Sequence, residues 1–363
     1  MHSNDEMMQR CLSLAGKGAG SVSPNPMVGC VIVKDGEIIG EGFHEKFGSA
    51  HAEVNAIRSA SGSVEGAEVF VNLEPCSFFG KTPPCVDLLI EKKVKKIHVA
   101  MLDPNPKVNG NGVMKLKDAG IEVEVGLLAE EARELNEAFT KYVTKAIPFV
   151  TLKMAQSLDG KIALTNGKSK YITSGESLRR VHELRVQHDA VLVGAGTVIA
   201  DDPSLTARLV KGRSPVRIIL DGKLRSPVGS GLFHDRKSRV IIFHSVKAGA
   251  KSARKIAALK KLGVELHGLR ADERGRIKIR TLLDRIAKLG IASILVEGGA
   301  EVFSEFVKAG MADKLQLFIA PAIIGKGKGA TDGIEVQRLE KAVRLKNIRT
   351  AQIGADLLVT GYF

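Results

Sequence analysis

The clearest chemical signal in the sequence is a group of metal-binding residue types. His51-Ala52-Glu53 is followed by Pro75-Cys76 and then by Cys85. One histidine and two cysteines can bind Zn²⁺ through three protein ligands, which leaves a fourth position for water and is typical of a catalytic site. Zinc lowers the pKa of that water, and Glu53 is placed to carry the proton to a leaving group. We therefore predict one zinc ion per chain, with His51, Cys76 and Cys85 as ligands and Glu53 as the catalytic proton carrier.

The remaining cysteines bear on whether this zinc site is catalytic or structural. A purely structural site uses a fourth cysteine or histidine, and none lies close by in the sequence. Cys11 and Cys30 lie in apolar runs and are predicted to be small core residues. Cys30 becomes a candidate ligand only if its strand turns towards the site. A non-catalytic, zinc-stabilised binding protein is disfavoured because it would not need Glu53.

The elements that position these residues alternate between strands and helices up to about residue 128, which predicts a three-layer α/β/α domain. A hairpin is predicted around Lys34-Asp35-Gly36, and a helix is predicted to begin after Pro83-Pro84. One connecting helix is predicted over 128–143. Ile147-Pro148 then breaks the pattern, so we predict two domains, 1–146 and 147–363.

The second domain is predicted to be another α/β series, with glycines where strands meet helices. Val193-Gly194-Ala195-Gly196-Thr197 and Leu295-Val296-Glu297-Gly298-Gly299 are the two clusters. Such glycines let backbone N–H groups approach a phosphate at a helix N-terminus. Each cluster alone is equally consistent with an ordinary turn. The G-x-G-x-x-G fingerprint is absent, since Ile199 stands at its third glycine, and a standard Rossmann site is excluded. The predicted strands are 149–154, 190–193, 216–221, 239–243, 293–297 and 315–319, and the predicted helices are 175–186, 250–262, 279–288 and 300–309.

The zinc-site motif resembles that of the cytidine-deaminase superfamily, H-x-E followed by P-C-x-x-C. Here eight residues, Ser77 to Pro84, separate the cysteines instead of two. This longer segment, together with Pro24-Asn25-Pro26-Met27-Val28-Gly29, is similar to the riboflavin-pathway deaminases. The resemblance implies that Asn25 holds the base or ribose of a substrate, and that His44 and Lys81 face its phosphate. A surface role at a strand end stays open for His44, and an exposed loop position for Lys81.

The second domain resembles the riboflavin-pathway reductases, whose fold is similar to dihydrofolate reductase. The residues that carry this likeness are the segment from Lys153 to Lys161, the two glycine clusters and Ala200-Asp201-Asp202-Pro203. The resemblance implies an NADPH site lined by Ala155, Tyr171, Thr197, Asp201, Gly299, Ala300, Glu301, Val302, Phe303, Ser304 and Glu305. It implies substrate contacts from Ser169, Arg185, Leu205, Arg208 and Glu297.

Three of these positions need comment. The reductase family often has Trp where Tyr171 stands, so stacking there is weaker. Arg185 and Arg208 suit a phosphate because guanidinium groups match its oxygens, although Arg185 can also be a helix-surface residue. Lys153 and Asp201 are candidates for proton handling during reduction, and a purely positioning role stays open for both.

Together the two resemblances cover nearly the whole chain and imply a bifunctional enzyme. The implied first reaction is zinc-dependent hydrolytic deamination of a diaminopyrimidinone that carries a ribosyl phosphate. The implied second reaction is NADPH-dependent reduction of the ribosyl side chain to a ribityl chain. The implied partners are therefore phosphorylated small-molecule pyrimidines, and the resemblance also implies a homo-oligomer, either dimer or tetramer.

The net charge of +14 leaves one alternative, a nucleic-acid-editing deaminase with a basic accessory binding domain. The basic residues are dispersed, and an aromatic content of 4% offers few stacking platforms for bases. We therefore expect no nucleic-acid partner.

The N-terminal residues up to Cys11 are polar and acidic, unlike a secretory signal. No apolar run approaches the roughly 20 residues that span a bilayer. We expect a cytoplasmic protein with no membrane partner.

Overall fold

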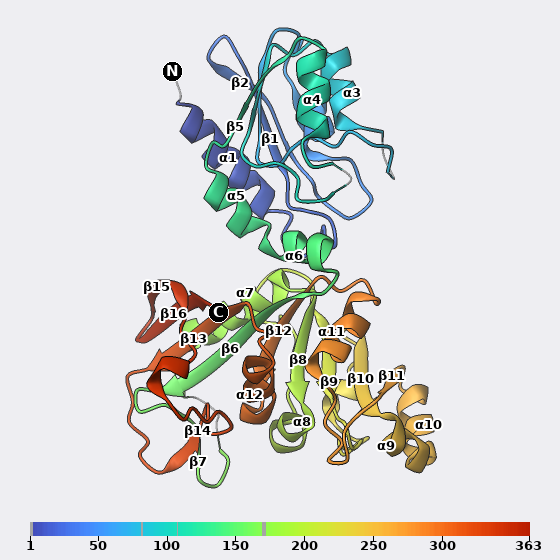
Figure 1. The fold of residues 1–363 in the computed structure, drawn as a ribbon, viewed down its shortest axis with the longest axis vertical. Helices are drawn as coiled ribbons and strands as arrows, with labels where there is room; N and C mark the ends of the chain where they lie inside the picture. Colours follow the sequence, from blue (N-terminus) through green and yellow to red (C-terminus); the bar gives the residue numbers. More distant parts are fainter. Residues whose placement is uncertain (1–2, 81–82, 107, 169–171) are drawn as a thin grey trace. The chain divides into compact units, whose positions relative to one another are not determined.

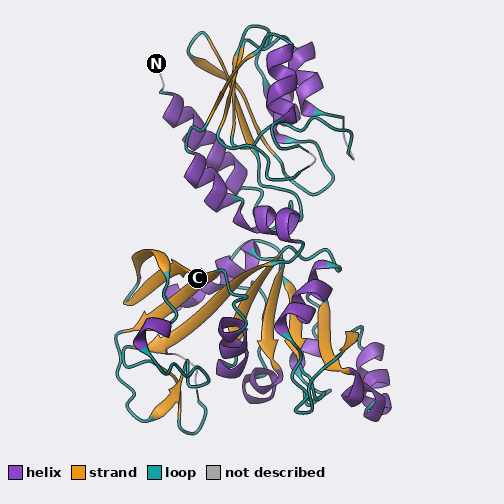
Figure 2. Ribbon diagram, viewed as in Figure 1, coloured by secondary structure: helices purple, strands orange, loops and turns teal. Residues whose placement is uncertain are grey.

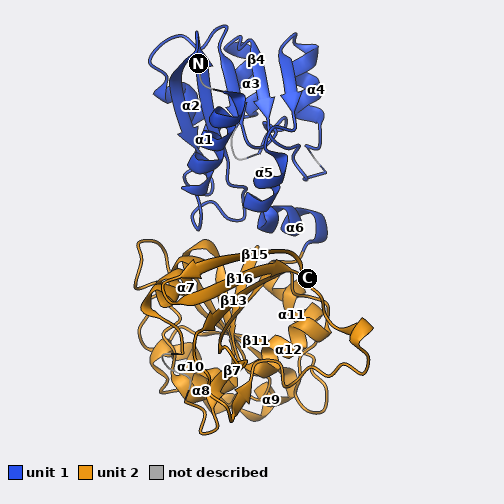
Figure 3. Cartoon of the chain, turned by 90° about the vertical axis from the view of Figure 1, so that its left-hand side faces the viewer, with its two compact units in different colours: residues 1–146 blue, residues 147–363 orange. Residues whose placement is uncertain are grey.

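The computed structural model describes residues 3–80, 83–106, 108–168 and 172–363. The chain divides into two compact units, residues 1–146 and residues 147–363 (Figure 3). Each unit has its own sheet and its own buried core.

Unit 1 is built on a five-stranded sheet. Its order is β2 (Glu37–Phe43), β1 (Gly29–Lys34), β3 (Glu68–Val71), β4 (Lys96–Val99) and β5 (Glu122–Val125). β1 pairs antiparallel with both β2 and β3, whereas β3, β4 and β5 run parallel. The carboxyl ends of these parallel strands share one edge, where α/β sheets commonly bind ligands.

Helices cover both faces of this sheet (Figure 2). Cys30 and Ile32 of β1 pack with α2 (Ala52–Ser59), α3 (Cys85–Glu91) and α4 (Asn111–Asp118). Val31, between them, packs with α1 (Asn4–Gly16) and α5 (Ala129–Leu135) on the opposite face. This alternation follows from the two-residue repeat of a strand and confirms the predicted α/β/α layers.

The connection that closes unit 1 differs from the prediction. Instead of one helix over 128–143, α5 ends at Leu135 and α6 (Glu137–Lys145) follows it. Asn136 lies between them, and its buried amide accepts from Met27 N at 2.8 Å and donates to Met27 O at 3.0 Å. This contact joins residues distant in sequence, so the local helical pattern does not reveal the break.

Unit 2 contains a nine-stranded sheet. The order is β11 (Glu265–Leu269), β10 (Val240–Ser245), β9 (Val216–Leu220), β8 (Ala190–Gly194), β12 (Ser293–Gly298), β6 (Phe149–Ser157), β13 (Lys314–Ala320), β16 (Asp356–Tyr362) and β15 (Lys346–Ile353). The strands from β11 to β13 are parallel, and β16 and β15 are antiparallel additions. The loops that follow β8, β9 and β12 therefore meet at one edge (Figure 1).

Both faces of the second sheet are also covered by helices. Ile294 and Val296 of β12 pack in a core with α11 (Ile279–Ala287) and α12 (Ala300–Lys308). Leu295 lies in a separate cluster with α7 (Gly175–Gln187). α8 (Ala195–Asp201) and α10 (Ala253–Lys261) contribute to a third cluster against β8, β9 and β10.

Several elements of unit 2 were not predicted from the sequence. The helix expected over 250–262 is present as α10 (Ala253–Lys261), but it starts after Ser252, and the residues before Ser252 form a separate short helix, α9 (Val246–Lys251). The sequence patterns also missed α8, β11, the β15–β16 hairpin and the small pair of β7 (Lys161–Leu164) with β14 (Gly327–Gly329). β15 is exposed along almost its whole length, so it lacks the apolar alternation that marks a strand.

Candidate active sites

The three predicted zinc ligands come together in unit 1. His51 immediately precedes α2, Cys85 is the first residue of α3, and Cys76 lies in the loop after β3. His51 Nδ1 is 3.5 Å from Cys76 Sγ and 3.3 Å from Cys85 Sγ. All three donor atoms lie within 4.8 Å of one another, so one ion can contact all of them.

The chemistry of these donors fits zinc. One imidazole nitrogen and two sulfurs form the ligand set of a catalytic zinc site with an open position. The Cys85 side chain donates a hydrogen bond to Cys76, which lowers the pKa of the Cys76 thiol and favours the thiolate that binds metal. The backbone N–H of Cys85 also donates to Cys76 Sγ at 3.3 Å.

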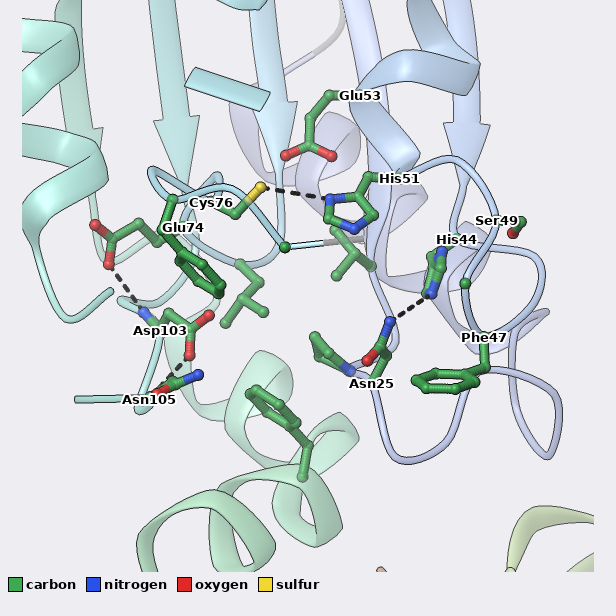
Figure 4. Close-up of a pocket in the computed structure, with 17 residues that line it drawn as sticks. Asn25, His44, Phe47, Ser49, His51, Glu53, Glu74, Cys76, Asp103 and Asn105 are labelled. Carbon is green, nitrogen blue, oxygen red and sulfur yellow. Dashed lines mark hydrogen bonds between the residues drawn. The ribbon is translucent and has the colours of Figure 1, made fainter. Parts of the chain in front are cut away.

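Glu53 lies beside the ligands but is not one of the three clustered groups. It is on the first turn of α2, two residues after His51, and its carboxylate points towards the space shared by the His51 ring and Cys76 (Figure 4). The side chain is buried, and burial raises its pKa. A carboxyl group that holds a proton more readily than usual suits the predicted role in proton transfer.

A pocket of about 270 Å³ is lined by His51, Cys76 and Glu53. Asn25 and His44 line it, and Asn25 Nδ2 is 3.2 Å from His44 Nε2 (Figure 4). His44 Nδ1 lies 3.0 Å from the carbonyl of Ala50, so Nδ1 donates there and Nε2 accepts from Asn25. His44 is only 3% exposed, which rules out the surface alternative. Lys81 lies outside the described residues, although Phe78 and Gly80 of the same loop line the pocket.

Sequence reasoning missed four polar residues of this pocket, Ser49, Glu74, Asp103 and Asn105. Glu74 accepts backbone N–H groups from Asp103, Gly110, Gly112 and Val113, so it organises the loop after β4. Burial raises the pKa of Asp103 to about 6. A signal was present, because Asp103-Pro104-Asn105 follows a buried strand at the carboxyl edge of the sheet.

The charged residues predicted in unit 2 also form a cluster. Arg185 Nε and Nη2 donate to the Glu297 carboxylate at 2.6 and 2.8 Å, and Nη1 donates to Thr206 O at 2.9 Å. Burial alone would raise the pKa of Glu297, but Arg185 reverses this and the pKa is lowered. Lys153 lies on β6, beside the β12 strand that carries Glu297, and burial lowers its pKa. Arg185 is thus largely engaged by the protein, and is not a helix-surface residue.

The other predicted substrate residues of unit 2 are placed differently from one another. Arg208 is exposed, after α8. Leu205 is buried with φ +55°, and its side chain belongs to a core cluster of unit 2. Asp201 is the half-buried last residue of α8. Ser169 and Tyr171 lie outside the described residues.

Unit 2 contains a cavity of about 260 Å³ where the glycine-rich loops meet. Gly194 and Gly196 of the first cluster and Gly299 of the second line it. A Cβ atom at Gly194 would lie 2.8 Å from Val302 Cγ2, and one at Gly298 would lie 2.9 Å from Thr197 Oγ1, so a larger residue at either position would displace a neighbouring side chain. No side chain in the described part of the chain caps α12, and its first N–H groups can donate to a phosphate. This cradle fits a dinucleotide such as NADPH.

The predicted NADPH-site residues are divided between this cavity and the core. Glu301, Val302 and Glu305 line the cavity together with Gly299, and Ala300 begins α12 beside them. Phe303 and Ser304 are buried, so their side chains belong to the interior of the unit. Ala155 pairs with Phe318 across β6 and β13, and it packs against the cluster that contains Leu295.

Comparison with protein-family models assigns both units. Residues 148–359 match the RibD C-terminal domain, and residues 1–101 match the cytidine and deoxycytidylate deaminase zinc-binding region. The chain belongs to the RibD family. It is similar to the riboflavin biosynthesis protein RibD of Aquifex aeolicus, with 43% identity over 97% of this chain and 96% of that protein. It is 38% identical to RibD of Escherichia coli over 96% of each chain.

Solved structures of the RibD family confirm the fold of both units. The deaminase/reductase of Thermotoga maritima superposes with a TM-score of 0.88 at 43% identity, covering 99% of this chain and 98% of that one. Acinetobacter baumannii RibD gives a TM-score of 0.87 at 36% identity, with the same coverage. The family match confirms an enzyme of riboflavin biosynthesis that has a zinc-binding deaminase domain and an NADPH-dependent reductase domain. None of the described helices has the length and apolar character needed to cross a membrane.

Proposed function

We propose that the two units act consecutively on one phosphorylated pyrimidine. Unit 1 deaminates 2,5-diamino-6-(5-phosphoribosylamino)pyrimidin-4(3H)-one, and unit 2 reduces the ribosyl side chain of the product to give 5-amino-6-(5-phosphoribitylamino)uracil. The observation that carries this proposal is a pocket lined by Glu53, His51 and Cys76, with Cys85 completing the group of three clustered metal-binding side chains. The name of the Thermotoga maritima relative gives the same two activities. The nucleic-acid-editing alternative is not favoured, because the similarity to RibD proteins spans both units.

In unit 1, the pocket residues bind and orient the pyrimidine. The amide of Asn25 and the ring of His44 hold each other in place and face the base or ribose. Asp103, held by Glu74, offers a buried carboxyl group to the N–H groups of the pyrimidine. Bound zinc activates the attacking water as a Lewis acid. Glu53 accepts a proton from that water and returns it to the departing amine.

In unit 2, NADPH supplies the hydride, and the protein holds the two reactants. Arg208 is exposed and has no ion pair among the residues that the structure describes, and its guanidinium binds the substrate phosphate. Arg185 holds Glu297 at the end of β12, where the carboxylate faces the substrate. Lys153, next to Glu297, is the proposed proton source for the reduced ribosyl group, and Asp201 positions the cofactor.

We also propose that the chain forms a homo-oligomer through unit 2. β15 is the edge strand of the nine-stranded sheet, and exposed edges of this kind favour pairing with another chain. Large apolar side chains are exposed on and beside it, including Leu339, Val343, Ile348 and Leu357. Light scattering after size-exclusion chromatography is expected to give a dimer or tetramer, and a monomer at micromolar concentration would contradict it.

The deaminase assignment is tested by replacing the proton carrier. Glu53→Gln keeps the size of the side chain but removes its carboxylate, so ammonia release should fall by at least about a hundredfold while zinc stays bound. Glu37→Gln, at the exposed start of β2, is the matched control and should match the wild type. Ammonia release is measured on the zinc-loaded full chain, and zinc per chain is counted in parallel. Undiminished ammonia release from Glu53→Gln would overturn the assignment.

A further inference from the structure

A short segment, residues 25–29, forms part of the wall of the unit 1 pocket and leads into β1. Asn25, Pro26 and Val28 line the pocket. The carbonyl of Val28 accepts a hydrogen bond from the backbone N–H of His44 at 2.8 Å, and Asn25 Nδ2 is 3.2 Å from His44 Nε2. The position of this segment therefore sets the position of both side chains that are proposed to hold the substrate.

Two asparagine side chains hold the backbone of this segment. Asn136 Oδ1 accepts the N–H of Met27 at 2.8 Å, and Asn136 Nδ2 donates to the carbonyl of Met27 at 3.0 Å. Asn72 Nδ2 donates to the same carbonyl at 3.0 Å, and Asn72 Oδ1 accepts the N–H of Gly29 at 2.8 Å. Asn136 is 1% exposed and Asn72 is 0% exposed. Because water does not readily replace hydrogen bonds at buried positions, truncating either asparagine weakens the hold on the segment.

The two asparagines tie the segment to different parts of unit 1. Asn72 directly follows β3 and precedes the zinc ligand Cys76 by four residues. Asn136 lies between α5 and α6. Gly29 is in addition packed against α1, where a Cβ atom would be 2.1 Å from Cys11 O. The segment is thus fixed relative to the loop of the zinc ligand by one asparagine, and relative to α5 and α6 by the other.

α6 also contributes a side chain to the pocket itself. Phe139, on the first turn of α6, lines the pocket and is half-buried. It packs against the core cluster that includes residues of α1 and α5. Asn136 and Phe139 both lie outside residues 1–101, which match the zinc-binding region of deaminases. The zinc chemistry shared with that region therefore does not account for these two residues, whereas recognition of a particular substrate does.

We propose that Asn136 is a positioning residue of the deaminase site and that Phe139 contacts the bound pyrimidine. This proposal rests on the proposed deamination by unit 1. Asn136 holds the segment of Asn25 at a fixed distance from the zinc ligands, and that spacing admits a pyrimidine that carries a ribosyl phosphate. The ring of Phe139 offers the flat base an apolar surface. Neither side chain can move a proton, so both act on substrate binding and leave proton transfer by Glu53 unchanged.

The direct test separates binding from chemistry in the full zinc-loaded chain. Asn136→Ala removes both hydrogen bonds to Met27, so KM for the phosphorylated diaminopyrimidinone should rise about tenfold or more. The value of kcat should stay within about threefold of the wild type, because an interaction that acts on binding alone is lost. Zinc per chain should stay unchanged. Phe139→Leu keeps an apolar side chain without the ring, and it should raise KM about threefold.

A second readout measures substrate affinity without turnover. Calorimetry on zinc-loaded Glu53→Gln, with and without Asn136→Ala, should show the same loss of affinity for the phosphorylated diaminopyrimidinone as the KM values do. The control is Thr144→Ala, at an exposed position of α6. It should leave KM, kcat and zinc content unchanged.

The possible outcomes distinguish this inference from the deaminase assignment. An unchanged KM in Asn136→Ala, or a fall in kcat and zinc content with unchanged substrate affinity, would overturn the inference and leave the assignment intact. If Asn136→Ala does not fold, Phe139→Leu decides the question, and unchanged substrate affinity in that variant would overturn the inference. If the wild type releases no ammonia, the deaminase assignment fails and the inference fails with it.

Discussion

The two sites of this chain are prepared for catalysis in different ways. In unit 1, the three zinc donors already lie within 4.8 Å of one another, and His51, Cys76 and Glu53 line one pocket whose side chains come mostly from 25–105. In unit 2, the predicted charged residues Arg185 and Glu297 form a buried pair with each other, and the proposed cofactor site is a glycine-lined cavity. The first site is thus built from side chains that bind metal, and the second from backbone and loops that need the cofactor to complete them.

The prediction with the largest expected effect tests whether reduction in unit 2 is independent of zinc binding in unit 1. Cys76→Ser removes one of three ligands, so zinc affinity and ammonia release should each fall by more than about a hundredfold. Reduction of supplied aminouracil substrate by NADPH should stay near the wild-type rate. Zinc content, ammonia and NADPH oxidation are measured on the same preparation. A parallel loss of reduction would show that the two sites are not separately built.

The next prediction concerns the internal pair of unit 2. Glu297→Gln leaves Arg185 buried without its counter-charge, which should cost about 3 kcal/mol of unfolding free energy. Reduction should also fall sharply, while ammonia release stays unchanged. The control is Glu265→Gln, which breaks the half-exposed Arg239–Glu265 pair and should cost under about 1 kcal/mol. Denaturant unfolding measures both variants, and equal costs would contradict the account of a buried, organising pair.

The smallest effect is a pH dependence in the same cluster. Burial, with Arg185 and Arg208 nearby, lowers the pKa of His182 from 6.5 to about 4. His182 Nδ1 accepts a hydrogen bond from the backbone N–H of Leu209 at 3.2 Å. Protonation of Nδ1 would remove this hydrogen bond. The unfolded chain therefore binds more protons than the folded one between these values, so stability should fall as pH drops from about 6.5 to about 4.

In this pH range His182 contributes up to about one proton to the difference in protons bound by the unfolded and folded chains. His182→Gln should remove that contribution, so the unfolding free energy should fall less steeply as the pH drops. Glu297 and Lys153 also act on His182, so the variant is compared with the wild type across the whole pH range and not at one pH. Unfolding midpoints in denaturant provide the measurement. An identical slope in the two proteins would contradict the assigned pKa shift.

The contrast between the units also explains what the sequence could predict. His51, Cys76 and Cys85 carry their chemistry in residue type and short spacing, so the zinc site was predictable from the sequence. Asn25 and His44 were expected only from the family resemblance, and their mutual hydrogen bond is a product of the fold. Glu74 and Asp103 were missed because their importance lies in four backbone contacts and in burial, which local pattern does not encode.

In unit 2, prediction was limited by distance along the chain. Arg185 and Glu297 are 112 residues apart, and parallel strands with crossover helices bring them together. The likeness to known reductases named both residues but did not indicate that they bind each other. The same limit applies to the helix broken at Asn136, whose cause is a contact with Met27 109 residues away. β15 was missed because an exposed strand carries no apolar repeat.

The measurement that tests the central claim most directly follows both reactions in one vessel. The full zinc-loaded chain is given the phosphorylated diaminopyrimidinone and NADPH, and ammonia release and NADPH oxidation are recorded together, beside Glu53→Gln. The wild type should show both signals, with ammonia first, and the variant should show neither until the deaminated aminouracil is supplied, when NADPH oxidation should return. Ammonia without NADPH oxidation would contradict the assignment of unit 2, and no ammonia from the wild type would contradict the whole account.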